Sequence, residues 1–163
     1  MKKIFYLALM ALPLAFLANS CHDDGDDLPD VTFQMTIENA TNVDGVIYVV
    51  QGEELKISSI DVQNRDTSKK ALITAANYYW DGFFLGYNLV SPFAFDIEIT
   101  DRTPVGRHEL EIESSVVAVD KSPAVALCVY PVMVVASAEE IPEGGATYFT
   151  VHPTISDSSK ANR

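Results

Sequence analysis

Few residues of this chain combine the types and the spacing that enzyme chemistry requires. Residues 108–112, HELEI, begin like the HExxH motif of zinc proteases, but the second histidine is absent and the segment alternates like a strand. The three histidines are isolated from one another in the sequence, and no CxxC pair is present. The sequence therefore predicts no catalytic residues, no metal site and no cofactor.

A row of carboxylates follows the same histidine. Glu109, Glu111 and Glu113 occupy every second position, so on a strand they would share one face at intervals of about 7 Å. Calcium binding or acid–base chemistry would need another acid facing this row. The pattern is more typical of a solvated strand face whose charges discourage edge-to-edge aggregation, and Asp96 and Glu98 have the same interpretation.

The best candidate for a binding site is the aromatic stretch at residues 71–88, ALITAANYYWDGFFLGYN. Asp81 and Gly82 separate two aromatic runs, and both tolerate the positive φ angles that a two-residue type I′ turn requires. A hairpin with this turn predicts four cross-strand pairs: Trp80 with Phe83, Tyr79 with Phe84, Tyr78 with Leu85 and Asn77 with Gly86.

Alternation along the two strands would divide this hairpin into two faces. We expect an inner face that forms a wall of the core, made of Ala76, Tyr78, Trp80, Phe83, Leu85 and Tyr87. The outer face would combine two aromatic rings with amides around an open glycine, through Asn77, Tyr79, Phe84, Gly86 and Asn88. Sugar rings stack on aromatic faces and their hydroxyls pair with amides, so a glycan site at Asn77, Tyr79, Phe84 and Asn88 is predicted. The alternative is that another strand or loop covers Tyr79 and Phe84 as a second small core.

The N-terminal segment has the pattern of a targeting signal. Two lysines precede an apolar run at residues 4–17, which is too short for a transmembrane helix of about 20 residues. The run ends in LANSC, and small residues directly before Cys21 resemble the lipobox of bacterial lipoproteins, although Leu17 lies one residue further from the cysteine than is usual. The resemblance implies cleavage before Cys21 and acylation of its thiol. The alternative is an ordinary secretory signal that is cleaved nearby.

The residues after Cys21 are acidic, with the sequence HDDGDD. They resemble the acidic stretch of Bacteroidota-type surface lipoproteins, which implies a chain attached to outer-membrane lipid and displayed at the cell surface. Cleavage would remove two lysines and no acid, so the net charge would change from −12 to −14. Such a charge argues against nucleic acid and anionic membrane surfaces as partners.

Short strands separated by turn residues account for the rest of the chain. Besides the hairpin, we expect strands at residues 31–38, 46–50, 55–62, 93–100, 107–119, 124–135 and 146–152, and no helix. The alternation slips near Ser58 and Ser59, which indicates a β-bulge. Residues 124–135 are almost continuously apolar, which predicts cover on both faces, with Pro131 at a bulge or an edge.

The region from about residue 53 to residue 135 resembles an immunoglobulin-like sandwich. Trp80 would lie late on strand C, and Asp101…Gly106-x-His108-x-Leu110 resembles the corner before strand F. His108 replaces the usual corner tyrosine and Leu110 the usual cysteine, which implies a core without a disulfide. The tyrosine hydroxyl that makes the corner hydrogen bond is absent, and a ring nitrogen of His108 could donate in its place. Cys128 is then an unpaired, buried apolar residue.

The predicted organisation is a signal peptide at 1–20, an acidic tether at 21–30, one domain at 31–153 and a frayed tail at 154–163. The predicted fold is all-β, an immunoglobulin-like antiparallel β-sandwich of about seven to nine strands.

We expect a non-catalytic surface lipoprotein that binds glycan within a polysaccharide capture system. The alternative is an adhesin or accessory subunit that contacts a neighbouring surface protein, for example by strand addition along residues 124–135, which needs an exposed edge. A hydrolase would require two acids that converge in a cleft.

Overall fold

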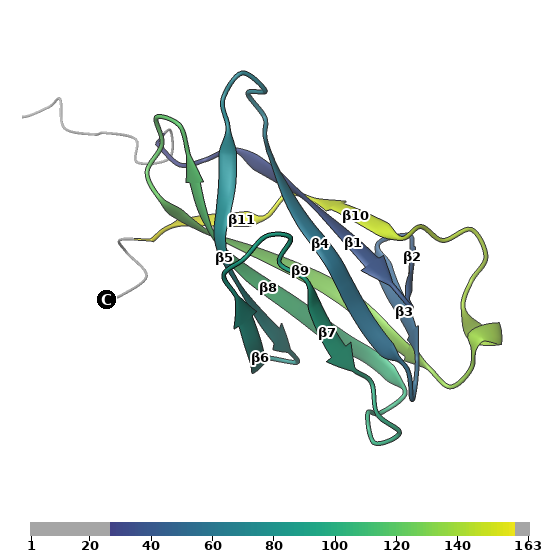
Figure 1. The fold of residues 1–163 in the computed structure, drawn as a ribbon. Coiled ribbons are helices and arrows are strands. Elements are labelled where there is room, and N and C mark those ends of the chain that lie inside the picture. Colours follow the sequence, from purple (N-terminus) through teal and green to yellow (C-terminus); the bar gives the residue numbers. More distant parts are fainter. Residues whose placement is uncertain (1–26, 159–163) are drawn as a thin grey trace, which may run out of the picture.

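The structure, a computed structural model, describes residues 27–158 as two sheets packed face to face (Figure 1). Sheet A has the strand order β10 (Tyr148–Val151), β1 (Val31–Glu38), β4 (Glu54–Asn64) and β7 (Phe95–Glu98). Sheet B has the order β2 (Thr41–Val43), β3 (Val46–Val50), β9 (Ala124–Val135), β8 (Gly106–Ala118), β5 (Ala71–Trp80) and β6 (Phe83–Asn88). A further strand, β11 (Thr154–Asp157), pairs with β9, and the only helical element of the described residues is a 3₁₀ turn at Ala138–Glu140.

The strand order is that of an immunoglobulin-like sandwich. In sheet A, β1, β4 and β7 occupy the places of strands A, B and E, and in sheet B, β9, β8, β5 and β6 occupy those of G, F, C and C′. The predicted all-β immunoglobulin-like fold is therefore confirmed. The described part of the chain has 11 strands instead of seven to nine, because the short strands β2 and β11, of three and four residues, were not predicted. Strand β10 corresponds to the strand predicted at residues 146–152.

Alternating apolar residues from the inner faces of both sheets form the core. On β1 the buried side chains are Val31, Phe33, Met35 and Ile37, and the bulge predicted near Ser58 is confirmed, because Thr36 pairs with Ser59 while Ile37 pairs with Ile57. Leu110 is fully buried at the position where many immunoglobulin-like domains have a cysteine. Cys128 is free and buried, and burial raises the pKa of its thiol to about 11.

Strand β9 differs from its prediction in two respects. Its burial alternates, so only one face is covered within residues 27–158, and the apolar side chains on the other face are half-buried or exposed: Val125, Leu127, Val129, Pro131 and Met133. The predicted exposed edge along residues 124–135 is wrong for most of the strand, because β8 runs along one side of β9 while β11 and β3 pair with residues 124–127 and 132–135 on its other side. Only residues 128–131 lack a strand partner there among the described residues.

Pro131 lies in the short part of β9 between the partners β3 and β11, where that edge has no strand partner among the described residues. On β8, Glu109 lies opposite Pro131. The Glu109 N–H donates to Asp81 Oδ1 and the Glu109 carbonyl accepts the Asp81 N–H, both at 2.9 Å, on the side of β8 that faces away from β9. The Glu109–Pro131 pair therefore needs no N–H from proline, which is why the ladder tolerates this residue.

Both ends of the described chain contact the turn between β8 and β9. The backbone N–H of Ser122 donates to the Asp27 carbonyl at 2.9 Å, and the Ser158 hydroxyl donates to the Pro123 carbonyl at 2.9 Å. Asp30 also bonds Arg65, so residues 27–30 of the predicted tether contact the domain. The predicted frayed tail is wrong for Thr154–Asp157, since these residues form β11 against residues 124–127. The predicted signal peptide, Cys21 and residues 22–26 and 159–163 lie outside the described residues.

Candidate functional site

The turn of the aromatic hairpin has the predicted form. Asp81 and Gly82 have φ angles of 49° and 77°, as a type I′ turn requires. Trp80 pairs with Phe83 and Tyr79 with Phe84, which confirms the two predicted pairs nearest the turn.

The next two predicted pairs are wrong because Leu85 is an extra residue in β6. Tyr78 pairs with Gly86, and Asn77 pairs with Tyr87. The inner face explains this register: Tyr78 stacks on Phe95 with ring centres 4.2 Å apart, and a Cβ at position 86 would lie 3.0 Å from the Phe95 ring. Glycine is therefore needed opposite Tyr78, where the Phe95 ring approaches the backbone.

This bulge changes which residues share a face. Ala76 and Tyr78 are buried as predicted, and Trp80 is half-buried, but the predicted wall residues Phe83, Leu85 and Tyr87 are exposed. Asn88 pairs with Ala76 and leaves the predicted outer set: its amide donates to the Ala94 carbonyl at 3.0 Å, and its carbonyl accepts the Val90 N–H at 2.9 Å.

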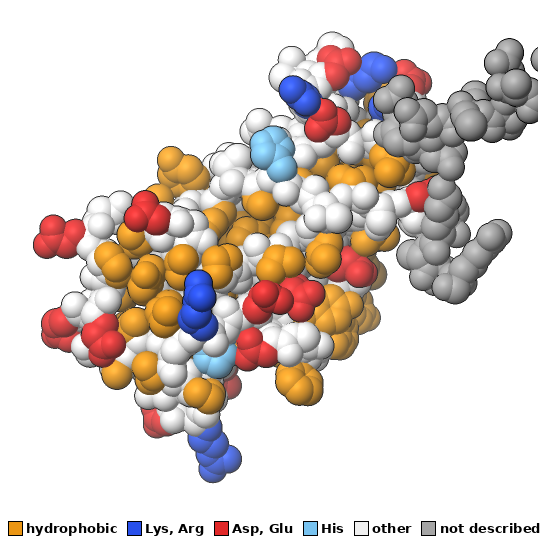
Figure 2. All heavy atoms as spheres, turned by 180° about the vertical axis from the view of Figure 1, so that it is seen from behind, with side chains coloured by type: hydrophobic (Ala, Val, Ile, Leu, Met, Phe, Trp, Pro, Cys, Tyr) orange, Lys and Arg blue, Asp and Glu red, His pale blue; other side chains and the backbone are white. Residues whose placement is uncertain are grey.

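The outer face of sheet B brings together three of the four predicted site residues, with Tyr87 in place of Asn88. We define the outer patch by two rows of paired residues across sheet B. In the first row, Phe84, Tyr79, Glu111 and Val129 follow one another on β6, β5, β8 and β9. In the second row, the residues on the same strands are Tyr87, Asn77, Glu113 and Leu127. Phe84, Tyr87 and Val129 have 57%, 63% and 44% of their surface exposed. Figure 2 shows hydrophobic side chains and carboxylates side by side on the surface of the molecule. The alternative of a second small core is therefore wrong for Phe84, because no described residue covers it.

Aromatic and polar side chains lie next to one another in the outer patch. The Tyr79 and Phe84 rings meet edge to face, with centres 5.4 Å apart and planes at 61°. The Asn77 amide donates to Glu113 Oε1 at 3.2 Å. Partial burial, together with the charges of Glu113 and Glu111, raises the pKa of Tyr79, so its phenol remains a neutral hydroxyl at physiological pH.

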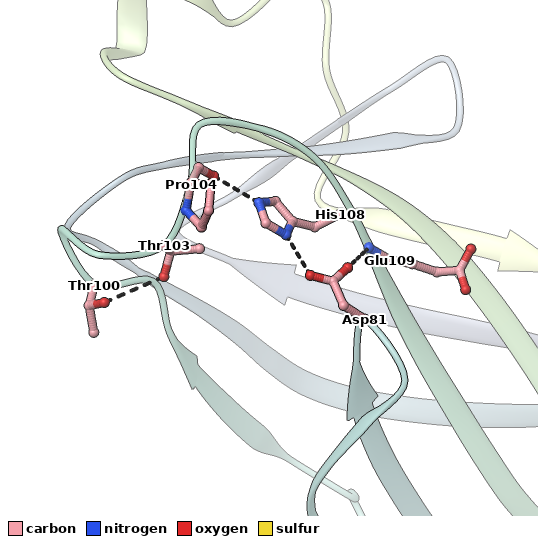
Figure 3. A network of polar contacts seen from close by, with 6 residues as sticks. All are labelled: Asp81, Thr100, Thr103, Pro104, His108 and Glu109. Carbon is pink, nitrogen blue, oxygen red and sulfur yellow. Dashed lines mark hydrogen bonds and ion pairs between the residues drawn. The ribbon is translucent and has the colours of Figure 1, made fainter.

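A second polar arrangement holds the tip of the hairpin (Figure 3). His108 bonds the Pro104 carbonyl through Nε2 and Asp81 Oδ2 through Nδ1, each at 2.7 Å, and the other Asp81 oxygen accepts the Glu109 N–H. Contact with the Pro104 carbonyl, four residues upstream, is the corner bond expected when histidine replaces the corner tyrosine. Sequence reasoning missed the Asp81–His108 pair, although adjacency of strands C and F in this fold brings the two residues together.

Both partners of the His108 ring are acceptors, so both bonds form only when the imidazole is protonated on both nitrogens. Burial alone would lower the pKa of His108, but the hydrogen bonds to Asp81 and Pro104 and the charge of Asp81 together raise it above its usual value. Trp80 also stacks on this ring, with centres 5.1 Å apart, which further favours the cation. We call this arrangement of His108, Asp81 and Pro104 the corner clamp.

The geometry gives little support for a metal site or for a hydrolase site. Within residues 27–158, no group of three His, Cys, Asp or Glu side chains is placed to hold a metal ion. Two shallow grooves open between the end of β4 and the start of β5, and neither is lined by a pair of acidic residues. Across the same described residues, the structure contains no helix with the length and apolar character needed to cross a membrane.

Comparisons with known proteins give distant similarity to solved structures alone. No protein-family model matches the chain, and no curated protein matches it either. Among solved structures, the chain is similar to the fibronectin(III)-like modules of CbhA from Clostridium thermocellum, with 17% sequence identity over 60% of this chain and 94% of that chain and a TM-score of 0.37. The fold assignment rests on the strand order and pairing described above.

Proposed function

We propose that this chain is a non-catalytic binding domain, held at the outer surface of the cell by a lipid on Cys21, which binds a partner through the outer patch. The observation that carries this proposal is a largely apolar outer face of sheet B that no residue of 27–158 covers. Outward side chains of β9 are apolar, and aromatic rings lie on the same face of β5 and β6, with the glutamates of β8 between them. An apolar surface of this kind on a soluble body marks a site of interaction.

A protein partner suits the patch better than a glycan. Asn88 faces away, and the Asn77 amide is already bonded to Glu113, so few free amides remain for sugar hydroxyls. The Tyr79 and Phe84 rings are inclined at 61° and do not form one flat platform. Aliphatic and aromatic side chains grouped on one exposed face are typical of protein interfaces.

Glycan binding remains the second candidate, within a polysaccharide capture system as the sequence suggests. Its support is the Tyr79–Phe84 cross-strand pair, which the structure keeps together with Asn77 on one face. A screen against polysaccharides tests it. Unchanged glycan binding by the Tyr79→Ala, Phe84→Ala double variant would remove the outer patch as the glycan site.

Site-specific photo-crosslinking on cells that display the full chain tests the binding face. A benzophenone side chain at Val129 should yield a discrete covalent adduct, because Val129 lies in the patch. The matched control places the same group at Gln34 on β1, whose side chain points outward from sheet A. Equal adducts from both positions, or none from Val129, would refute docking through this face. Protease digestion of the adduct separates a protein partner from a glycan.

Placement at the membrane needs a separate measurement. Mass spectrometry of the purified chain should find a mature N-terminus at Cys21 that carries acyl groups, and Cys21→Ala should release the chain from the membrane fraction. A mature start elsewhere with an unmodified Cys21 thiol would contradict the lipid attachment while leaving the outer patch unaffected.

A further inference from the structure

The carboxylates of the outer patch restrict what can dock there. Glu111 and Glu113 lie on β8, between the apolar side chains of β9 on one side and the aromatic hairpin on the other. Both are half-buried in the free domain, and Glu109 continues the row opposite Pro131. A partner that covers this face with apolar side chains would therefore remove water from carboxylates as well.

Within residues 27–158, no cationic side chain forms an ion pair with this row, and Arg107, two residues before Glu109 on β8, forms none with it either. Ion pairs such as Lys56–Glu38, Arg65–Asp30, Lys69–Asp120 and His108–Asp81 lie elsewhere, and none of those between described residues includes the three glutamates of the row. Only the Asn77 amide bonds Glu113, and an amide carries no charge. Burial of an unpaired carboxylate is strongly unfavourable, so the compensating charge has to come from the partner.

We infer that the partner is a protein surface that presents arginine or lysine side chains among apolar ones, with the cations placed along Glu109, Glu111 and Glu113. This inference rests on the proposed function. The three carboxylates do not form a metal cluster within residues 27–158, so organic cations are the matching charge.

Arginine fits the patch better than lysine does. A guanidinium can bind a carboxylate through two parallel N–H donors and stack on an aromatic ring at the same time. Tyr79 lies opposite Glu111 and against Phe84, so a ring and a carboxylate are available side by side. The net charge of −12 also attracts a basic partner from a distance.

The spacing of the row suggests a direct probe. Alternate residues of an extended segment are about 7 Å apart, so an acetylated octapeptide of alternating arginine and valine would match the glutamate spacing. The control peptide carries citrulline, the neutral isostere, in place of arginine. Binding to the ¹⁵N-labelled full-length chain in detergent is followed by amide chemical shifts, which also locate the contact.

The arginine peptide should shift amides of β5, β8 and β9 around the outer patch, and binding should weaken as salt is raised. The citrulline peptide should not bind measurably. Equal binding of the two peptides, or arginine-dependent shifts that fall outside the patch, would overturn the inference.

Matched charge variants separate the patch from general attraction to an acidic protein. Glu109→Gln, Glu111→Gln and Glu113→Gln together should weaken binding of the arginine peptide about tenfold. The control combines Glu54→Gln, Asp96→Asn and Glu98→Gln, which removes an equal number of negative charges from the exposed outer face of sheet A. This control should weaken binding of the arginine peptide less than about twofold. Equal losses in both variants would refute a specific basic partner. Dispersed amide spectra of the free variants verify that both remain folded.

The crosslinking experiment tests the binding face, and the peptide experiment tests the basic partner, so their negative results can be told apart. A Val129 crosslink without discrimination between arginine and citrulline would remove the basic partner and keep the binding face. Absence of a Val129 crosslink on cells would remove the proposed function, whatever the peptides do.

Discussion

The outward faces of the two sheets differ, although both sheets contribute their inner faces to one core. On sheet A, the outward side chains of β1 and β7 are polar: Thr32, Gln34, Thr36, Glu38, Asp96 and Glu98. On sheet B, the outward side chains of β9 are apolar along its length, and the hairpin adds aromatic rings. Since the fold requires only the inner faces to be apolar, the fold does not account for the apolar side chains on the outer face of sheet B, and these are the basis of the proposed binding face.

Chemical labelling of neighbouring positions on β9 should give the largest contrast between inner and outer faces. Cys128 is 2% exposed with a thiol pKa raised to about 11, whereas a cysteine at Val129 would be accessible with an ordinary pKa. At pH 8 the difference in thiolate population alone makes iodoacetamide react on the order of 100-fold more slowly at Cys128. Peptide mass mapping of the wild-type chain and the Val129→Cys, Cys128→Ala variant measures it. Similar rates would mean that the outer face of β9 is covered.

Substitution of adjacent tyrosines on β5 should separate stability from binding. Tyr78→Ala removes a fully buried ring that stacks on Phe95 and donates to the Phe93 carbonyl, so we expect a loss of about 3–5 kcal/mol in the free energy of unfolding. Tyr79→Ala should cost less than about 1 kcal/mol, because its ring lies on the outer face. Urea titration of both variants compares the two costs. A comparable cost at Tyr79 would place it within the core and end its role as a free binding residue.

The pH dependence of stability tests whether the corner clamp pre-orders the hairpin that carries the patch. Because the folded pKa of His108 is raised, its contribution is complete below the unfolded value of about 6.5 and is lost as the pH rises through the folded pKa. The free energy of unfolding of the wild-type chain should therefore decrease between about pH 6 and pH 8.

Asp81→Asn is the matched control for this pH effect. It should cost about 1–2 kcal/mol at pH 6, since it removes the charged acceptor of His108, and it should flatten the decrease above pH 6. The measurement is urea denaturation at several pH values. A decrease of the same size in the variant would show that His108 does not cause it.

The smallest expected effect concerns the inner face of sheet B. Ser114 is 1% exposed, its hydroxyl has no hydrogen-bond partner among the described residues, and it lies between Ala76 and Ala126. Ser114→Ala should raise the free energy of unfolding by up to about 1 kcal/mol, because a buried hydroxyl without a partner is unfavourable. Thermal unfolding measures the change. A clear loss of stability would point to a bond through water that this hydroxyl makes.

Local patterns predicted much of this fold. Alternation in VTFQMTIE gave the correct inner face of β1, Asp81-Gly82 gave the turn, and the slip near Ser58 gave the bulge. Each of these features depends on residues that are close in sequence. The position of His108 relative to Gly106 and Leu110 placed it at the corner, and the structure shows that its ring bonds the Pro104 carbonyl there.

Contacts between distant residues account for most of what could not be predicted. The bulge at Leu85 depends on Phe95, which approaches the backbone at Gly86, and Asn88 faces away from the patch for the same reason. Periodicity alone cannot show such a displacement. The apolar run of β9 predicted cover on both faces, whereas within residues 27–158 only one face is covered, and the proposed binding face rests on this difference.

The bonds from Asp27 to Ser122 and from Ser158 to Pro123 have a practical consequence for engineering. They bring the two ends of the described chain to adjacent residues of one turn, so a linker of a few residues could join them and new termini could be opened in another surface loop. A circularly permuted chain of this kind could be presented from a different point on the sandwich without rebuilding its interior.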